Sequence, residues 1–135
     1  MKTNIATTRE QSDRLLRCGV SAESADMMIT PHNTLSTEAY KSVLKDRGYF
    51  PAFSLSALLG LLPFKIHSGN YEYWLDVAPM DYGKQWSIGY YCTEKPRVIK
   101  GLAHTDSLIE CAVLMVEWLV ANGYKLNGIE KGDEV

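Results

Sequence analysis

The stretch HTDSLIECAVLMVEWLVANGY, residues 104–124, decides the fold because it predicts the longest helix of the chain. Ser107 and Glu110 have the spacing of a capping box, in which each residue bonds to the backbone N–H of the other at a helix start. Gly123 suits the left-handed position just after a helix end. Inside the predicted helix, Glu110 and Glu117 are the only charged residues. The helix therefore offers little polar surface to water.

Apolar side chains surround this helix almost completely. At about 100° per residue, Glu110 and Glu117 fall on one line. Four apolar residues lie opposite: Leu108, Ala112, Met115 and Leu119. Other large residues flank the glutamates: Val113, Leu114, Trp118 and Val120. Burying one such side chain contributes about 1.5–3 kcal/mol, and a whole domain has a net stability of only about 5–15 kcal/mol. We therefore expect a second layer on this helix, from N-terminal helices of the same chain or, alternatively, from another subunit.

The first part of the chain is predicted to be mainly helical. Thr7 with Glu10 has capping-box spacing, and Thr8 with Gln11 offers the same spacing one residue later. Cap and stop residues predict helices over residues 8–18, over 21–28, within 36–48 and over 55–62.

Two strand-like segments follow. YEYWLDVA, which begins at Tyr71, and QWSIGYYC, which begins at Gln85, are rich in aromatic and β-branched residues, and PMDYGK between them is typical of a turn. Pairing Ala78 with Gln85 gives a hairpin with one core face and one outer face. On the outer face this register places Trp74 across from Gly89, where the ring can cover the bare backbone.

These elements predict the fold class α+β: an antiparallel β-hairpin or three-stranded sheet packed against a long C-terminal helix, with an N-terminal helical subregion. FKIHS, residues 64–68, is the candidate third strand, and residues 93–106 form a connection with a short strand at 97–99. We expect a single domain, divided into a helical part (about 1–63), a hairpin (about 64–94), a connection and C-terminal helix (about 95–124) and a tail (125–135).

Length and composition are those of an ordinary globular chain. The 135 residues are 46% hydrophobic and carry a formal net charge of −2, which does not favour nucleic acid or an anionic membrane. Cys18, Cys92 and Cys111 are odd in number and far apart, so we expect free thiols in a reducing compartment. We see no signal-peptide pattern and no run of ~18–20 apolar residues. We therefore expect a cytoplasmic protein without membrane contact.

An enzymatic function is the third of three hypotheses. His104, Asp106 and Cys92 are the candidate residues for a small-enzyme site. Acidic residues at a helix start are explained more simply by the helix dipole, and we assign no catalytic residue. The sequence contains no nucleophile elbow, Walker loop or dinucleotide-binding motif. His32, His67 and His104 share no metal-ligand spacing, so we predict no metal and no cofactor.

A nucleic-acid-associated regulator is the second hypothesis. Two basic groups support it: Lys95, Arg97 and Lys100 in one loop, and Arg9, Arg14 and Arg17 on the first helix. Glu10 and Asp13 dilute the second group. Glu72 and Asp76 flank the rings on the outer hairpin face and would repel phosphates. A nucleic-acid partner is therefore disfavoured.

Binding of a protein is the favoured hypothesis. The outer hairpin face, with Trp74 and Tyr91, has large rings in its centre and polar residues around them, as protein contact surfaces do. The flank of the last helix, with Val113, Leu114 and Trp118, is the second candidate surface. We predict a non-enzymatic accessory interaction module whose partner is an unidentified protein or, by self-association as a homodimer, a second copy.

Three segments together resemble a known family. They are TTREQSDRLLRCGVSAESADM (residues 7–27), PAFSLSALLGLLP (51–63) and SLIECAVLMVEWLVANGY (107–124). They are similar to a family of small proteins without an assigned activity, encoded by Bacteroides-type bacteria and by their phages and mobile elements. The resemblance implies a bacterial or phage-related cytoplasmic setting and an accessory role, and it transfers no functional residue.

Overall fold

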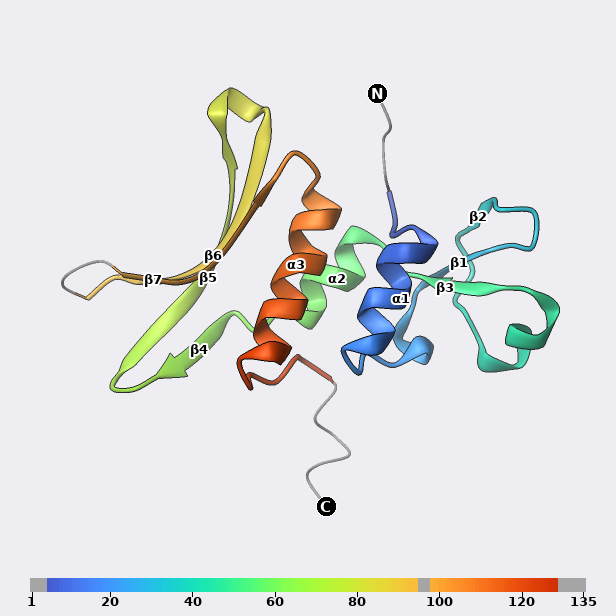
Figure 1. The fold of residues 1–135 in the computed structure, drawn as a ribbon, viewed down its shortest axis with the longest axis horizontal. Coiled ribbons are helices and arrows are strands. Elements are labelled where there is room, and N and C mark those ends of the chain that lie inside the picture. Colours follow the sequence, from blue (N-terminus) through green and yellow to red (C-terminus); the bar gives the residue numbers. More distant parts are fainter. Residues whose placement is uncertain (1–4, 95–97, 129–135) are drawn as a thin grey trace, which may run out of the picture.

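The C-terminal helix α3 (Leu108–Ala121) lies in the middle of the molecule, between a curled four-stranded sheet and the helices α1 and α2 (Figure 1). The computed structural model describes residues 5–94 and 98–128. Helix α3 contacts β6 and β7 of the sheet as well as α1 and α2. Val113 and Val116 are fully buried. The predicted second layer is confirmed, and it is supplied by the same chain.

The α-helices begin where the cap signals of the sequence place them. They are α1 (Arg9–Arg17), α2 (Leu55–Leu61) and α3. Thr8, Ser54 and Ser107 are the N-caps, and each hydroxyl accepts a hydrogen bond of 3.1–3.2 Å from a backbone N–H of the first turn. In α1 the capping box forms between Thr8 and Gln11, the second of the two predicted spacings, and not between Thr7 and Glu10.

A small three-stranded sheet lies where two other helices were predicted. Its strands are β1 (Met27–Ile29), β2 (Leu35–Ser36) and β3 (Phe50–Ala52), antiparallel in the order β2-β1-β3. The helix predicted over residues 21–28 is wrong, because Ser21 caps only a short 3₁₀ turn, after which the backbone becomes extended at Ala25.

The helix predicted within residues 36–48 is also wrong. A 3₁₀ turn, Ser42–Arg47, takes its place and ends at Gly48, whose φ of 87° is the left-handed value expected of a helix stop. The N-terminal part of the described chain is therefore a mixture of helix, 3₁₀ turn and short strand, and it still closes the second side of α3 through α1 and α2.

The larger sheet has four antiparallel strands in the order β4-β5-β6-β7. They are β4 (Lys65–Ser68), β5 (Tyr71–Met80), β6 (Gln85–Cys92) and β7 (Val98–Thr105). The expected connection after the hairpin is wrong over most of its length, because residues 98–105 form a full strand along β6. The fold is α+β.

The hairpin register differs from the predicted one by two residues, since Ala78 pairs with Ser87 and not with Gln85. The sequence predicts a turn at Pro79 because proline interrupts a central strand. However, β4 pairs with β5 only as far as Trp74. At Pro79, β5 is therefore an edge strand, where a residue without an N–H is tolerated. A shift of two residues leaves every side chain on its predicted face.

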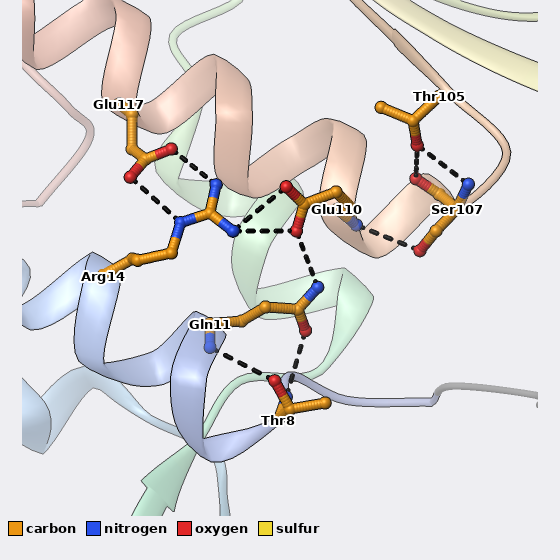
Figure 2. Close-up of polar contacts among 7 residues, drawn as sticks. All are labelled: Thr8, Gln11, Arg14, Thr105, Ser107, Glu110 and Glu117. Atoms are coloured by element: carbon orange, nitrogen blue, oxygen red, sulfur yellow. Dashed lines mark hydrogen bonds and ion pairs between the residues drawn. The ribbon is translucent and has the colours of Figure 1, made fainter.

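A cluster of polar side chains joins α1 to α3 (Figure 2). The Arg14 guanidinium donates two hydrogen bonds to Glu117, at 2.6 and 3.1 Å, and a further one of 3.0 Å to Glu110. The Gln11 amide donates to the same Glu110 carboxylate at 2.8 Å. The hydrogen bond to Glu117 is the largest cause of the raised pKa of Arg14. The two glutamates of α3 therefore face α1.

Candidate interaction surface

The flank of α3 has partners within the chain. Val113 is fully buried in the core, and Leu114 is partly buried against it. Trp118 stacks between the rings of Tyr90 and Tyr124, with centroid separations of 6.5 and 5.6 Å. The prediction of a contact surface here is wrong for Val113, and the packing of Leu114 and Trp118 explains their apolar character without a partner.

The other predicted surface, on the sheet, faces away from α3. Ile88 and Tyr90 point to the opposite side and are buried in the same core cluster as the helix. Cross-strand partners share a face. One row of partners crosses all four strands: Lys65, Trp74, Tyr91 and Ile99. The next row crosses three strands: Asp76, Gly89 and Leu102. We call the residues of these two rows the outer face.

Large apolar side chains on the outer face remain about half exposed. The exposed fraction is 43% for Trp74, 50% for Ile99 and 51% for Leu102. Scattered apolar residues are normal on a protein surface, but a contiguous group marks a contact site. Trp74 and Tyr91 were predicted from the sequence. Ile99 and Leu102 were missed because residues 93–106 were interpreted as a connection, whose short predicted strand at 97–99 was neither extended nor paired with the hairpin.

The absence of a side chain at Gly89 allows neighbouring side chains of the outer face to pack directly against its backbone. A Cβ on Gly89 would lie 2.9 Å from the Gly101 carbonyl oxygen, 3.1 Å from Tyr91 Cε2 and 3.2 Å from Leu102 Cδ1. The prediction that Trp74 covers this glycine is wrong, because the true register places Trp74 opposite Tyr91. Tyr91 and Leu102 are the side chains that cover Gly89.

Polar residues border the tryptophan at the β4 end of this face. The Lys65 ammonium lies 5.3 Å from the centre of the Trp74 ring, within cation–π range. The Glu72 carboxylate lies 3.2 Å from His67 Nε2 and 3.5 Å from Lys65 Nζ. The hydrogen bond with His67, followed by the charge of Lys65, lowers the pKa of Glu72. The charge of Glu72 is therefore compensated locally.

Asp76 is a carboxylate in the middle of the outer face. It lies on β5 two residues after Trp74, faces Gly89 across the strands, and is exposed. Within residues 5–94 and 98–128, no cationic side chain forms an ion pair with Asp76. The apolar face therefore carries one acidic group without a counter-ion from the described part of the chain.

The residues of the predicted enzymatic site are not brought together. Cys92 pairs with Val98 at one end of the β6–β7 ladder, and His104 pairs with Ser87 at the other end. Ser87 and Cys92 are separated by about 16 Å at ~3.3 Å per strand residue. Cys92 is buried on the core side, whereas His104 and Asp106 are exposed. This grouping is therefore contradicted as a catalytic site.

The basic residues of α1 already have partners. Arg14 binds the two α3 glutamates, Arg17 pairs with an aspartate one turn earlier, and the Arg9 guanidinium lies 5.4 Å from the centre of the Phe50 ring. Two residues of the other predicted basic group lie outside the described residues: Lys95 and Arg97. Helix α1 thus does not present its arginines as an unpaired basic stripe.

The cysteines carry no sign of activation. All three are free thiols, with Cys92 and Cys111 buried and Cys18 partly buried. Burial is the largest cause of the raised pKa of Cys111, which opposes formation of a thiolate. In the described part of the chain, no three His, Cys, Asp or Glu side chains are grouped as metal ligands. None of the described helices combines the length and apolarity that crossing a bilayer requires.

Comparisons with protein-family models, with curated proteins and with solved structures found no match to this chain.

Proposed function

We propose that the protein is a non-enzymatic interaction module that binds another protein through the outer face of its four-stranded sheet. One observation carries the proposal: Trp74, Ile99 and Leu102 gather on one face and remain 43–51% exposed. A partner that covered them would remove apolar area from water, which is the main favourable contribution to most protein association. The polar border around Trp74 matches the rim of known contact surfaces.

The biological setting is part of the same proposal. The resemblance of residues 7–27, 51–63 and 107–124 to small proteins of Bacteroides-type bacteria, phages and mobile elements supports an accessory role in the cytoplasm of such a host. The partner is then a protein of the host or of the mobile element.

Charge substitutions on the outer face test the proposal. Tagged wild-type protein, Trp74→Glu and Leu102→Glu are expressed in the native host, and the proteins that co-purify are quantified by mass spectrometry. Val43→Glu is the matched control, because Val43 is 72% exposed but lies on the 3₁₀ turn Ser42–Arg47, outside the larger sheet. We expect the same partner with wild type and Val43→Glu, and its loss with the other two variants.

Two results would contradict the proposal. Recovery of the same partner in equal amount with all four proteins would show that the outer face is not the contact. A partner lost equally with Val43→Glu would show that the loss reflects added charge and not the surface. Thermal melting of each variant confirms that the fold persists, and sedimentation equilibrium shows whether the partner is a second copy of the chain.

A further inference from the structure

We infer that the outer face binds a basic segment of the partner protein, and that an arginine side chain of this segment pairs with Asp76. The inference rests on the proposed function and adds the chemistry of the partner. Trp74 lies on β5 between two acidic residues that point to the same side of the strand, Glu72 and Asp76.

The two carboxylates differ in their surroundings. Glu72 bonds to both Lys65 and His67, and the Lys65 ammonium also lies over the Trp74 ring. The tryptophan therefore already attracts one cation from within the chain. Asp76 lies two residues after Trp74 on the same face of β5 and forms no ion pair with the described residues.

A partner that covers this face must neutralise the charge of the Asp76 carboxylate. Burying an ionised carboxylate without a cation is strongly unfavourable, so a purely apolar partner would lose much of what it gains from Trp74 and Leu102. A guanidinium removes this penalty. It can donate two parallel N–H groups to the carboxylate, and its plane can stack on an aromatic ring. The face offers both groups next to each other.

The acidic charge of the outer face disfavours the two other candidate partners, a second copy of the chain and a nucleic acid. A second copy of the chain would bring its own Asp76 to a symmetric contact, and Lys65, the cation on the neighbouring strand, is already bonded to Glu72. A nucleic acid would bring phosphates toward Asp76 and Glu72, whereas binding of phosphates requires a cationic surface. An arginine-bearing protein segment satisfies both the apolar and the acidic parts of the outer face.

Selection from a random peptide library tests the inference on the intact protein. Peptides are selected on the wild type and counter-selected on Trp74→Ala, which adds no charge, so that the retained peptides require the Trp74 side chain of the outer face. Their affinities are then measured for wild type, for Asp76→Asn and for Asp81→Asn. Asp81, on the exposed hairpin turn, controls for the loss of one negative charge. A synthetic version of each peptide carries citrulline, the uncharged isostere of arginine.

We expect the retained peptides to be enriched in arginine. Their affinity should fall roughly tenfold on Asp76→Asn and on arginine-to-citrulline exchange, the loss of one charge-assisted hydrogen bond. The two losses should not add, and Asp81→Asn should change little. Retained peptides without basic residues, or with the same affinity for Asp76→Asn, would overturn the inference and leave the proposed function standing.

Failure of the proposed function would give a different result. In that case no selected peptide would distinguish wild type from Trp74→Ala, and the inference would fall with it. A single-stranded oligonucleotide that binds wild type but not Trp74→Glu, or a dimer that Trp74→Glu dissociates, would assign the face to one of the other two occupants and overturn the inference.

Discussion

Gly89 and Gly101 lie on neighbouring strands and serve opposite faces of the sheet. Gly89 lies under Tyr91 and Leu102 on the outer face. On the core side, a Cβ on Gly101 would lie 2.8 Å from the ring of Trp118. Each glycine allows a large side chain to approach the backbone closely. The reason for Gly101 is its contact with Trp118, which is distant in the sequence. In the sequence alone, Gly101 only weakens the strand signal of residues 98–105.

Gly89→Ala is expected to lower the free energy of unfolding by about 1–3 kcal/mol, as overpacking does. Its Cβ would lie 2.9 Å from the carbonyl oxygen of Gly101, so the backbone must shift. Gly60→Ala is the control, because this glycine lies within α2 and a Cβ there would meet nothing within 4 Å. It should raise stability by up to ~1 kcal/mol. Urea denaturation measures both, and a Gly89 variant as stable as the Gly60 variant would refute the close contact.

Tyr90 gives a pH prediction. Its hydroxyl donates to the Pro63 carbonyl oxygen at 2.6 Å, and burial raises the pKa of the phenol above its ordinary value. The folded state thus holds this proton more tightly than the unfolded state. The resulting stability is complete below the unfolded-state pKa of about 10 and is lost as the pH rises above it.

Tyr90→Phe should therefore cost about 1 kcal/mol at neutral pH, the value of one buried hydrogen bond. It should also make the decline of stability above about pH 10 shallower than in the wild type. Chemical denaturation at a series of pH values tests both effects. Parallel curves for the two proteins at alkaline pH would contradict the assignment to Tyr90.

The helices and strands show which signals in the sequence are sufficient to predict an element of secondary structure. Helices α1, α2 and α3 were predicted because caps are local: Thr8, Ser54 and Ser107 each bond within their own first turn. Strands β1, β2 and β3 contain only two or three residues, too few to show an alternating pattern. Pro51 inside β3 further disguises it. The pairing of β1 with β3 joins residues more than 20 positions apart, such as Met27 and Ala52, and no local pattern reports it.

The polar cluster between α1 and α3 predicts how much Arg14 contributes to the packing of these two helices. Arg14→Ala should lower the free energy of unfolding by about 1–3 kcal/mol, the range for a lost charged hydrogen-bond donor. Its side chain is 24% exposed, so water screens part of the loss. The glutamates at 110 and 117 would remain close together without their shared cation.

Arg17→Ala is the matched control for this prediction. Arg17 pairs with Asp13 on the surface of the same helix, and its side chain is 75% exposed. Exposed ion pairs of this kind contribute about 0–1 kcal/mol. Thermal and urea unfolding of both variants provides the measurement. Equal losses for the two arginines would mean that the bonds to Glu110 and Glu117 do not stabilise the docking of α1.

Two tryptophans lie on opposite sides of the four-stranded sheet and have different roles in the molecule. Trp118 belongs to the core stack with Tyr90 and Tyr124, whereas Trp74 lies on the outer face with 43% of its surface exposed. Trp118→Ala should therefore cost about 3 kcal/mol, as large-to-small core substitutions do. Trp74→Ala should cost less than ~1 kcal/mol. Differential scanning calorimetry compares them, and a reversed order would contradict the division into core side and outer face.

The candidate site could be predicted from the sequence in part. The alternation of YEYWLDVA places Trp74 and Asp76 on the same side of the hairpin as Tyr91. A register shift by an even number of residues does not change this, so the outer face was predicted correctly despite the register error of two residues. Ile99 and Leu102 could not be placed, because Lys100, Gly101 and Ala103 dilute the strand pattern. Val113 and Trp118 could not be separated from true surface residues for a different reason: the sequence does not show what packs on α3.

The bonds between α1 and α3 have a consequence for the synthesis of the protein. Arg14 and Glu117 are 103 positions apart, so the first helix leaves the ribosome long before its partner exists. At about 5–20 residues per second, the delay is roughly 5–20 s. Throughout that interval the core around Leu15, which is fully buried in the finished molecule, lacks the side chains that α3 contributes to it. The nascent chain therefore completes its core only when its last helix emerges.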